Sequence, residues 1–527
     1  MRKIKEESIQ KATMIMMSTI LLSRLLGFVR EMLVANIFGR SYITDAFFAA
    51  FSIPDLMYYL LVGGALNSGF MPVFNTQKAK GDEEGAWKAA STFLTVALIF
   101  IVVFNIVGII FAPYLMPLVA NGISKNPEAF ALAIKLTRIM FTAVSFTVMA
   151  GLLGGILNSY KIFSVPSMGP VLYNVGIITG AVLLSKAFGI YGLAIGVVIG
   201  AFLNFGIMVP SFRKVGSMFR FQLDLQNPLY KRMLLLMAPA LVGLSFSQVN
   251  LVVNQNIASM LNEGSITALR YANRIILLPL GIFASSISIA IFPTLNNLIG
   301  QNEMKEYKKT LFWGLKSILF ITIPSSIGMI VLNVPIVRLL FRTGKFTEQD
   351  VHITAYALAF YSIGVIGQSA VQVVTRAYYS LQDTMTPVKV GALMVVLNLI
   401  LNLAFLRVSS LAIGGIALSY SITSILNVVI LYKLLDKRLE GLNTKEVTAT
   451  IVKSSAASLL MGAAAYFTTH LVEGALGFES KLSQLVGVGA GVAVGAVIFF
   501  AVAYMLKMEE LAFVTNILKK KFKKSAA

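Results

Sequence analysis

The chain has 527 residues, of which 57% are hydrophobic and only 13% are charged, and its mean hydropathy is +0.80. A soluble protein carries about 25% charged residues, so this composition excludes a soluble protein and indicates one that crosses a membrane many times. The net charge of +21 does not require a nucleic-acid partner, because lysine and arginine concentrate in alternate connections, as in cytoplasmic loops that face anionic lipids. The absence of cysteine excludes disulfides and thiolate metal sites.

Fourteen apolar segments are long enough to span a hydrocarbon core, which takes about 20 residues. They are residues 12–37, 45–71, 89–113, 128–156, 166–185, 189–211, 233–260, 271–298, 310–333, 353–377, 387–406, 411–432, 448–470 and 483–506. The bias of basic residues between alternate loops predicts that both termini are cytoplasmic. The first segment is too long for a signal-peptide core and is not followed by a small-residue cleavage site, so we expect it to be retained. The sequence thus predicts an all-α integral membrane protein with 14 transmembrane helices.

The first segment carries charges where a membrane helix normally has none. Ser23, Arg24, Gly27, Arg30 and Glu31 fall within one sector of about 120° on a helix. Each charge would cost at least ~2.5 kcal/mol if it faced lipid, so this face should look into protein or water. We interpret it as a functional face. The alternative is a buried Arg–Glu pair that only locks helix packing.

Further charged residues lie near the ends of other segments. Asp45 opens the second segment, either as a helix N-cap with Thr44 or as part of a site. Asp55, deeper in the same segment, is the expected counter-ion of one arginine of the first segment. Arg274 lies near the start of the eighth segment and is expected to face those arginines. Together these groups predict a net positive pocket with apolar walls, which suits an amphiphile with a phosphate headgroup.

The chain also repeats itself at a nearly constant offset. Pro72 matches Pro293 and Ser159 matches Ser380, both 221 residues apart, and Gly192 matches Gly415 at 223. We predict a tandem duplication, with six helices in each half and a pseudo-two-fold axis normal to the membrane. The predicted parts are an N-terminal lobe (1–222), a C-terminal lobe (223–445), and two added helices with a basic cytoplasmic tail (446–527).

A second polar set predicts a possible ion site. Its members are Asn250, Asn398, Asn402, Ser419 and Thr423. They either supply neutral oxygens to a coupling cation or form hydrogen bonds between helices, and the absence of a carboxylate favours the second alternative. No histidine pair, carboxylate dyad or glycine-rich phosphate loop is apparent, so we expect no enzymatic activity, no metal and no cofactor.

Five stretches resemble one known family. They are SRLLGFVRE (23–31), TDAFFAAFSIPDL (44–56), FSVPSMGP (163–170), RTGKFTEQD (342–350) and YYSLQDTMTPVK (378–389). In this order, and with fourteen segments, they are similar to the MurJ family of lipid II flippases, within the superfamily of multidrug, oligosaccharidyl-lipid and polysaccharide exporters. The resemblance covers the first twelve segments. It implies two lobes around a cationic cavity, and a hydrophobic groove, made with the last two helices, for a lipid tail.

By motif match, the resemblance places the family's essential arginines on Arg24, Arg30 and Arg274 and its acidic position on Asp45. The chain also departs from the family. Many members carry two arginines and a glutamate in the second helix, where this chain has Tyr58, Tyr59 and Gly63, and the acidic residue before the arginine of the eighth helix is Asn273 here. An arginine and a carboxylate are lost together, which keeps local neutrality and leaves open what the second helix contributes to substrate binding.

The resemblance implies a monomeric transporter in the bacterial plasma (inner) membrane. Its substrate would be an undecaprenyl-pyrophosphate-linked disaccharide peptide, moved from the inner to the outer leaflet by alternating access. One alternative is a flippase for another polyprenyl-linked oligosaccharide, which would share the arginine pocket. A cation-coupled drug exporter would need an acidic cavity and usually twelve segments. A membrane enzyme acting on lipid headgroups would need a histidine or a carboxylate dyad.

Overall fold

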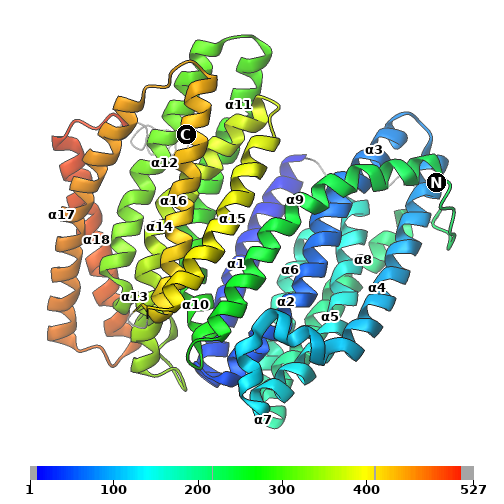
Figure 1. The fold of residues 1–527 in the computed structure, drawn as a ribbon, viewed down its shortest axis with the longest axis horizontal. Helices are drawn as coiled ribbons and strands as arrows, with labels where there is room; N and C mark the ends of the chain where they lie inside the picture. The colour runs from blue at the N-terminus through cyan, green and yellow to red at the C-terminus, as the bar shows by residue number, and fades with distance from the viewer. Residues whose placement is uncertain (1–8, 216–217, 409–410, 512–527) are drawn as a thin grey trace. The chain divides into compact units, whose positions relative to one another are not determined.

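The computed structural model describes residues 9–215, 218–408 and 411–511 (Figure 1). Over these residues the secondary structure is helical, without a strand, so the all-α prediction is confirmed. Twelve helices, or runs of consecutive helices, are long and apolar enough to cross a membrane among the described residues. Apart from end residues, each of the fourteen apolar segments coincides with one helix or one such run. The two segments beyond the twelve coincide with α1 (Ile9–Phe38) and α9 (Pro228–Ser259).

The chain forms two compact units, Met1–Thr267 and Ala268–Ala527. The other helices of the first unit are α2 (Tyr42–Tyr58), η1 (Tyr59–Phe70), α3 (Met71–Ala79), α4 (Glu83–Ala120), η2 (Asn121–Lys125), α5 (Pro127–Ser159), α6 (Ser164–Thr179), η3 (Gly180–Leu184), α7 (Ser185–Phe188) and α8 (Ile190–Val215). The helices from α10 onward are α10 (Ser265–Pro279), η4 (Leu280–Ala284), α11 (Ser285–Gly300), α12 (Met304–Val331), α13 (Asn333–Phe341), α14 (Glu348–Ser380), α15 (Met385–Leu406), α16 (Ala412–Arg438), α17 (Thr444–Leu476) and α18 (Lys481–Met505).

Two long helices contain wide π-helical turns at corresponding places. In the run Tyr42–Ala79 the π-helical segment η1 begins at Tyr59, and in the run Ser265–Gly300 the segment η4 begins at Leu280. These starts are 221 residues apart, which is the offset of the sequence repeat. Within η1, the side-chain amide of Asn67 donates to the carbonyl of Val62 at 3.2 Å.

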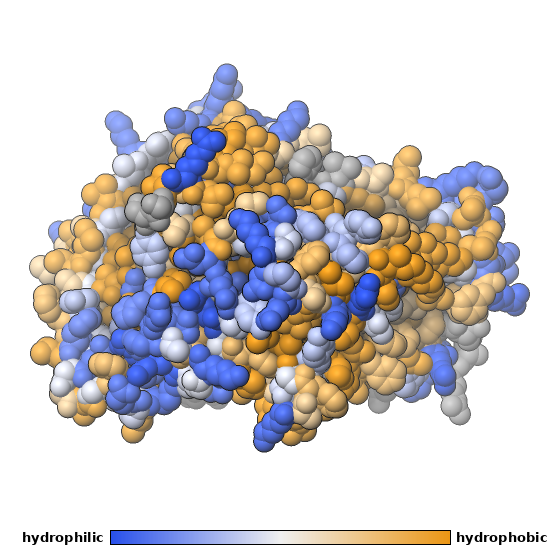
Figure 2. Space-filling view, turned by 60° about the horizontal axis from the view of Figure 1, so that its bottom comes forward, coloured by the Kyte–Doolittle hydropathy of each residue, from blue (hydrophilic) through white to orange (hydrophobic). Residues whose placement is uncertain are grey.

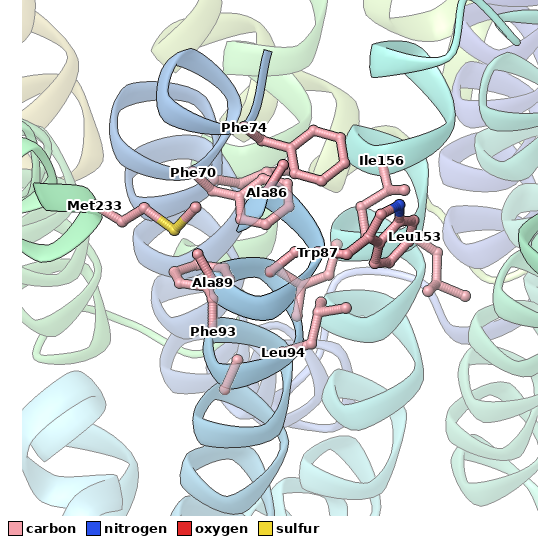
Figure 3. Packing of buried hydrophobic residues seen from close by; sticks show 14 of the residues in the cluster. Phe70, Phe74, Ala86, Trp87, Ala89, Phe93, Leu94, Leu153, Ile156 and Met233 are labelled. Carbon is pink, nitrogen blue, oxygen red and sulfur yellow. The ribbon is translucent and has the colours of Figure 1, made fainter. Parts of the chain in front are cut away.

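An aromatic core holds one end of the first unit together (Figure 3). Phe70, Phe74, Trp87 and Ile156 are almost completely buried and meet in this core from η1, α3, α4 and α5. The indole N–H of Trp87 donates to the hydroxyl of Tyr160 at 2.9 Å, so a buried polar group finds its partner just beyond the end of α5. Burial of these large side chains fixes α3 and α4 against α5.

Within the first unit, α9 packs along η1 and α4, as Figure 1 also shows for the green helix beside the blue and cyan ones. Near its end, Asn256 donates to the carbonyl of Leu118 at 2.7 Å. The hydroxyl of Ser259 accepts from the backbone N–H of Gly122 at 2.9 Å. A side chain at Gly122 would overlap the carbonyl of Ser259, so this contact requires glycine. The predicted lobe boundaries at residues 222/223 and 445/446 rest on the repeat and stay predictions.

In the second unit, α14 packs between α12 and α16, and α17 and α18 pack against each other and onto α12. The contact between α12 and the last two helices includes Phe320, Met461 and Phe499. Many large hydrophobic side chains elsewhere on the protein are exposed, among them Leu459, Leu471, and Val497. Figure 2 shows that hydrophobic residues cover much of the visible face, between patches of hydrophilic ones. Such a surface is stable only against lipid.

Candidate functional site

The charged face of α1 contains an ion pair between neighbouring residues. A guanidinium nitrogen of Arg30 lies 2.7 Å from Oε1 of Glu31, and the side chains are 16% and 3% exposed. A second guanidinium nitrogen of Arg30 donates to Oδ1 of Asn174 on α6 at 3.2 Å. Glu31 therefore neutralises Arg30, and the guanidinium group is held from two directions. Arg24, on the same sector of the helix, is exposed.

Asn174 connects this face of α1 to α6. Its amide nitrogen donates to the carbonyl of Ser23 at 3.2 Å and to the carbonyl of Pro170 at 2.9 Å, while its oxygen accepts from Arg30. Asn174 thus fixes both Ser23 and Arg30. The sequence analysis did not select it, although a single amide inside the apolar segment 166–185 is a signal that could have found it.

A cavity of about 190 Å³ opens within the first unit, beside this cluster. It is lined from α2 and η1, α5, α6 and α8, by Phe51, Pro54, Asp55, Tyr58, Tyr59, Met140, Ala143, Val144, Thr147, Pro170, Tyr173, Val197 and Asn204. Asp55 and Tyr173 interact electrostatically with Arg30, so the cavity adjoins the ion pair. Tyr58 and Tyr59 are part of the lining. These are two of the positions at which this chain differs from many members of the family that it resembles.

Asp45 is buried and holds a loop near the start of α10. Its Oδ2 accepts from the backbone N–H of Gly264 at 2.7 Å. Its Oδ1 accepts from the backbone N–H of Thr267 at 2.8 Å and from the Thr267 hydroxyl at 2.7 Å. The N-cap residue of α2 is Ser41, whose N–H donates to the Thr44 hydroxyl at 3.0 Å. Asp45 lies in the first turn of α2, and the residues that donate to its carboxylate are 219 or more positions away in the sequence.

The remaining residues selected from the sequence are divided between the two units. Arg274 is half-buried on α10 in the second unit, and its expected approach to the arginines of α1 stays a prediction. Asn250 lies on α9 in the first unit.

The other four polar residues lie on α15 and α16, which pack against each other in the second unit. Asn398 and Asn402 are buried and share a hydrogen bond of 3.1 Å. The hydroxyls of Ser419 and Thr423 donate to carbonyls of their own helix, at 2.9 and 2.8 Å. This pattern satisfies the hydroxyl donors locally and leaves the oxygen lone pairs as acceptors. A cation site here remains a prediction.

The comparison with known families decides which group the chain represents. The family described as lipid II flippase MurJ matches residues 34–515. The chain belongs to the MurJ family. The recognition made from the five sequence stretches is therefore confirmed, and the family is one of transporters.

Individual relatives agree with this assignment. A lipid II flippase MurJ of Burkholderia cenocepacia is 34% identical over 427 residues, which cover 79% of this chain and 82% of the relative. A solved structure of a lipid II flippase MurJ in an inward closed conformation is 28% identical, with a TM-score of 0.78, and covers 94% of this chain and 99% of that one.

A more distant structure shares the fold. It is an inward-facing multidrug resistance MATE family transporter of the MOP superfamily, 14% identical, with a TM-score of 0.68 over 82% of this chain and 99% of that one. At this identity the likeness shows the fold alone. Within the described residues, no group of three histidine, cysteine or acidic side chains is placed to hold a metal ion.

Proposed function

We propose that this protein moves lipid II from the inner to the outer leaflet of the bacterial plasma (inner) membrane by alternating access. The observation that carries the proposal is Arg30, whose guanidinium is held by Glu31 and Asn174 inside a helix that is largely apolar. A charge kept at this depth in a membrane helix is costly and marks a site. Family membership supplies the substrate class.

The membrane topology in this proposal has fourteen spans and cytoplasmic termini. Helices α1 and α9 supplement the twelve apolar runs, since their 30 and 32 residues are long enough to span the hydrocarbon core. The starts of η1 and η4 are 221 residues apart, as are the matched residues of the sequence repeat, and this supports the pseudo-two-fold axis. The protein is proposed to work as a monomer, without a cofactor, and the identity of any coupling ion is left open.

The pyrophosphate of the substrate is the group that the arginines would bind. Arginine presents several N–H donors in a planar fork and stays charged at any physiological pH. Arg24 is exposed, whereas Arg30 is already bonded to Glu31 and Asn174. We assign initial capture of the phosphate to Arg24, and to Arg30 the further N–H donors, held in place by Glu31 and Asn174, that keep it. Arg274 is also proposed to bind the substrate. No bond of the substrate is made or broken, so the protein is proposed not to be an enzyme.

Depletion of the protein in its host tests this function. We expect lipid II to accumulate on the inner leaflet, and expression of the wild-type chain, but not of Arg30→Ala, to restore its appearance outside. Arg138→Ala is the matched control, since Arg138 is an exposed arginine on α5 that donates to the carbonyl of Ile109. Accumulation of a different polyprenyl-linked oligosaccharide would favour the first alternative. Normal lipid II export with loss of drug resistance would favour a drug exporter.

A further inference from the structure

Aromatic side chains dominate the cavity beside Arg30. Phe51, Tyr58, Tyr59 and Tyr173 line it from α2, η1 and α6, and its volume is about 190 Å³. Its one carboxylate, on Asp55, interacts electrostatically with Arg30. Charge of both signs is thus already present and matched at this end of the cavity, so the cavity has no preference for a cation or for an anion. A neutral ligand with polar groups on an apolar frame suits it best, and a sugar ring is such a ligand.

Tyr59 is the ring best placed to carry a ligand. Its side chain is 47% exposed, whereas Tyr58 beside it is partly buried. The two rings stand edge to face, with centroids 5.8 Å apart. An aromatic ring is negative on its face and positive at its edge. The C–H groups on one side of a sugar ring are weakly positive and pack on such a face, while the sugar hydroxyls point away from it.

The same lining offers partners for those hydroxyls. The phenol of Tyr58 interacts electrostatically with Asp55 and with Tyr59, which places their polar groups near one another. The hydroxyl of Thr147 donates to the carbonyl of Ala143 at 3.0 Å, so its oxygen keeps lone pairs that can accept. Phenol hydroxyls both donate and accept, as sugar hydroxyls do. A pocket that is mainly apolar, with a few polar groups that fix orientation, is the usual form of a ligand site.

We propose that this cavity is a sugar subsite, in which one ring of the lipid headgroup stacks on Tyr59. The inference rests on the proposed function, because the sugar of that substrate is attached directly to the pyrophosphate. Tyr173 lines the cavity, and its neighbour Asn174 holds Arg30. The phosphate site and the sugar subsite are therefore adjacent, as the covalent structure of the headgroup requires.

Two lipids that differ only in the sugar and its peptide test the proposal. The full-length protein in nanodiscs is titrated with lipid II and with undecaprenyl pyrophosphate, which carries no sugar. We expect Tyr59→Leu to weaken binding of lipid II about fivefold, equivalent to ~1 kcal/mol, and to leave binding of undecaprenyl pyrophosphate unchanged. The second lipid thus checks that the variant is folded and that its arginines still bind phosphate.

Tyr59→Phe is the conservative variant and should bind lipid II nearly as the wild type does, because the ring remains. Arg24→Ala should weaken binding of both lipids. Asp224→Asn, an exposed exchange in the loop before α9, should bind both lipids as the wild type does.

Three outcomes would overturn the sugar subsite. The first is a preference for lipid II over undecaprenyl pyrophosphate that is the same in Tyr59→Leu, in Thr147→Val and in the wild type, with Thr147→Val shown to be folded by its melting curve. The second is binding of free N-acetylglucosamine that requires Tyr59 while the two lipids bind equally well, since the cavity would then serve a free sugar. The third is equal binding of the two lipids to all variants.

These outcomes differ from failure of the proposed function. A protein that binds and exports lipid II with no effect of Tyr59→Leu is a lipid II flippase without this sugar subsite. A protein that neither binds lipid II nor restores its export is not a lipid II flippase, whatever its cavity binds.

Discussion

The backbone N–H of Tyr42 donates to Oε1 of Glu263 at 2.8 Å, and these two residues are 221 positions apart. This separation equals the offset of the predicted sequence repeat, so the two residues hold matching places in the two predicted halves. Arg40 also bonds to the carbonyl of Glu263, and Asp45 holds Gly264 and Thr267. The loop after α1 and the loop after α9 therefore form one hydrogen-bonded junction.

Asp45→Ala should weaken this junction strongly. The substitution leaves the N–H groups of Gly264 and Thr267 without their acceptor, at ~1–3 kcal/mol for each buried donor. We expect a lower thermal unfolding midpoint of the purified protein, with Asp45→Asn intermediate because one oxygen acceptor remains. Asp224→Asn is the control. A melting curve of Asp45→Ala that overlays the wild type would show that the junction does not stabilise the fold.

The two arginines of α1 should separate binding from stability. Arg24 is exposed, so Arg24→Ala should leave abundance in the membrane unchanged and abolish lipid II export. Arg30→Ala should abolish export and also lower stability, since it removes the guanidinium that lies 2.7 Å from the buried carboxylate of Glu31. Lysine at either position should restore export only in part, because it lacks the planar fork. Complementation and quantitative immunoblotting measure the two effects.

Glu31→Gln provides the matching test of the pair. If Glu31 mainly neutralises Arg30, this exchange should impair export less than the loss of either arginine. A Glu31→Gln variant more impaired than Arg30→Ala would instead show that Glu31 takes part in proton or cation transfer.

A buried lysine should attach the segment just beyond α18 to α12 within the second unit. Lys316 on α12 is 5% exposed, and its ammonium lies 3.0 Å from Glu509 and 3.4 Å from Glu510, just beyond α18. Lys316→Met would leave Glu510, which is also buried, without its cation, so we expect destabilisation by ~3–5 kcal/mol.

The double variant Lys316→Met/Glu510→Gln should recover much of that loss, because the charge that remains, on Glu509, is exposed to solvent. Chemical denaturation in detergent measures the wild type, Lys316→Met, Glu510→Gln and the double variant. Additive effects of the two substitutions would show that this ion pair does not couple α12 to the end of α18.

The loop between α14 and α15 should give the protein an acid-sensitive contribution to stability. The pKa of Asp383 lies below its usual value, mainly because its carboxylate accepts a hydrogen bond of 3.0 Å from the backbone N–H of Thr386. The Thr386 hydroxyl and the guanidinium of Arg438, which is 2.6 Å from the carboxylate, lower the pKa further. A lowered pKa stabilises the folded state above the unfolded value of about 3.9, and this contribution is lost as the pH falls through the folded pKa.

Asp383→Asn should therefore melt at a lower temperature than the wild type at pH 7, and the difference should shrink as the pH falls below about 4. Asp224→Asn should show no such pH-dependent difference. A gap between Asp383→Asn and the wild type that stays constant down to pH 3 would contradict the assignment.

The sequence predicts the positions of the apolar segments well, since hydrophobicity over about 20 residues is a local property. It also places Arg30 beside Glu31, which are neighbours in the chain. It does not find Asn174, because that contact joins positions 144 residues apart. The N-cap interpretation of Asp45 considered only its own helix, whereas the carboxylate binds a distant loop. The sequence does not predict the cavity at Asp55 either, because the packing of several helices creates it.

The driving force of transport follows from the charge of the substrate. A diphosphate headgroup carries about two negative charges outward across an inside-negative potential, at about 2.3 kcal/mol per charge and 100 mV, so export gains up to ~4–5 kcal/mol. The empty carrier then returns with the positive charge of Arg24, which unlike that of Arg30 is not neutralised by Glu31, and the same potential favours that return. We expect valinomycin with potassium, which collapses the potential, to stop flipping in vesicles even when proton and sodium gradients persist. Undiminished flipping at zero potential, dependent on a sodium gradient, would instead assign the coupling to the polar set of Asn250, Asn398, Asn402, Ser419 and Thr423.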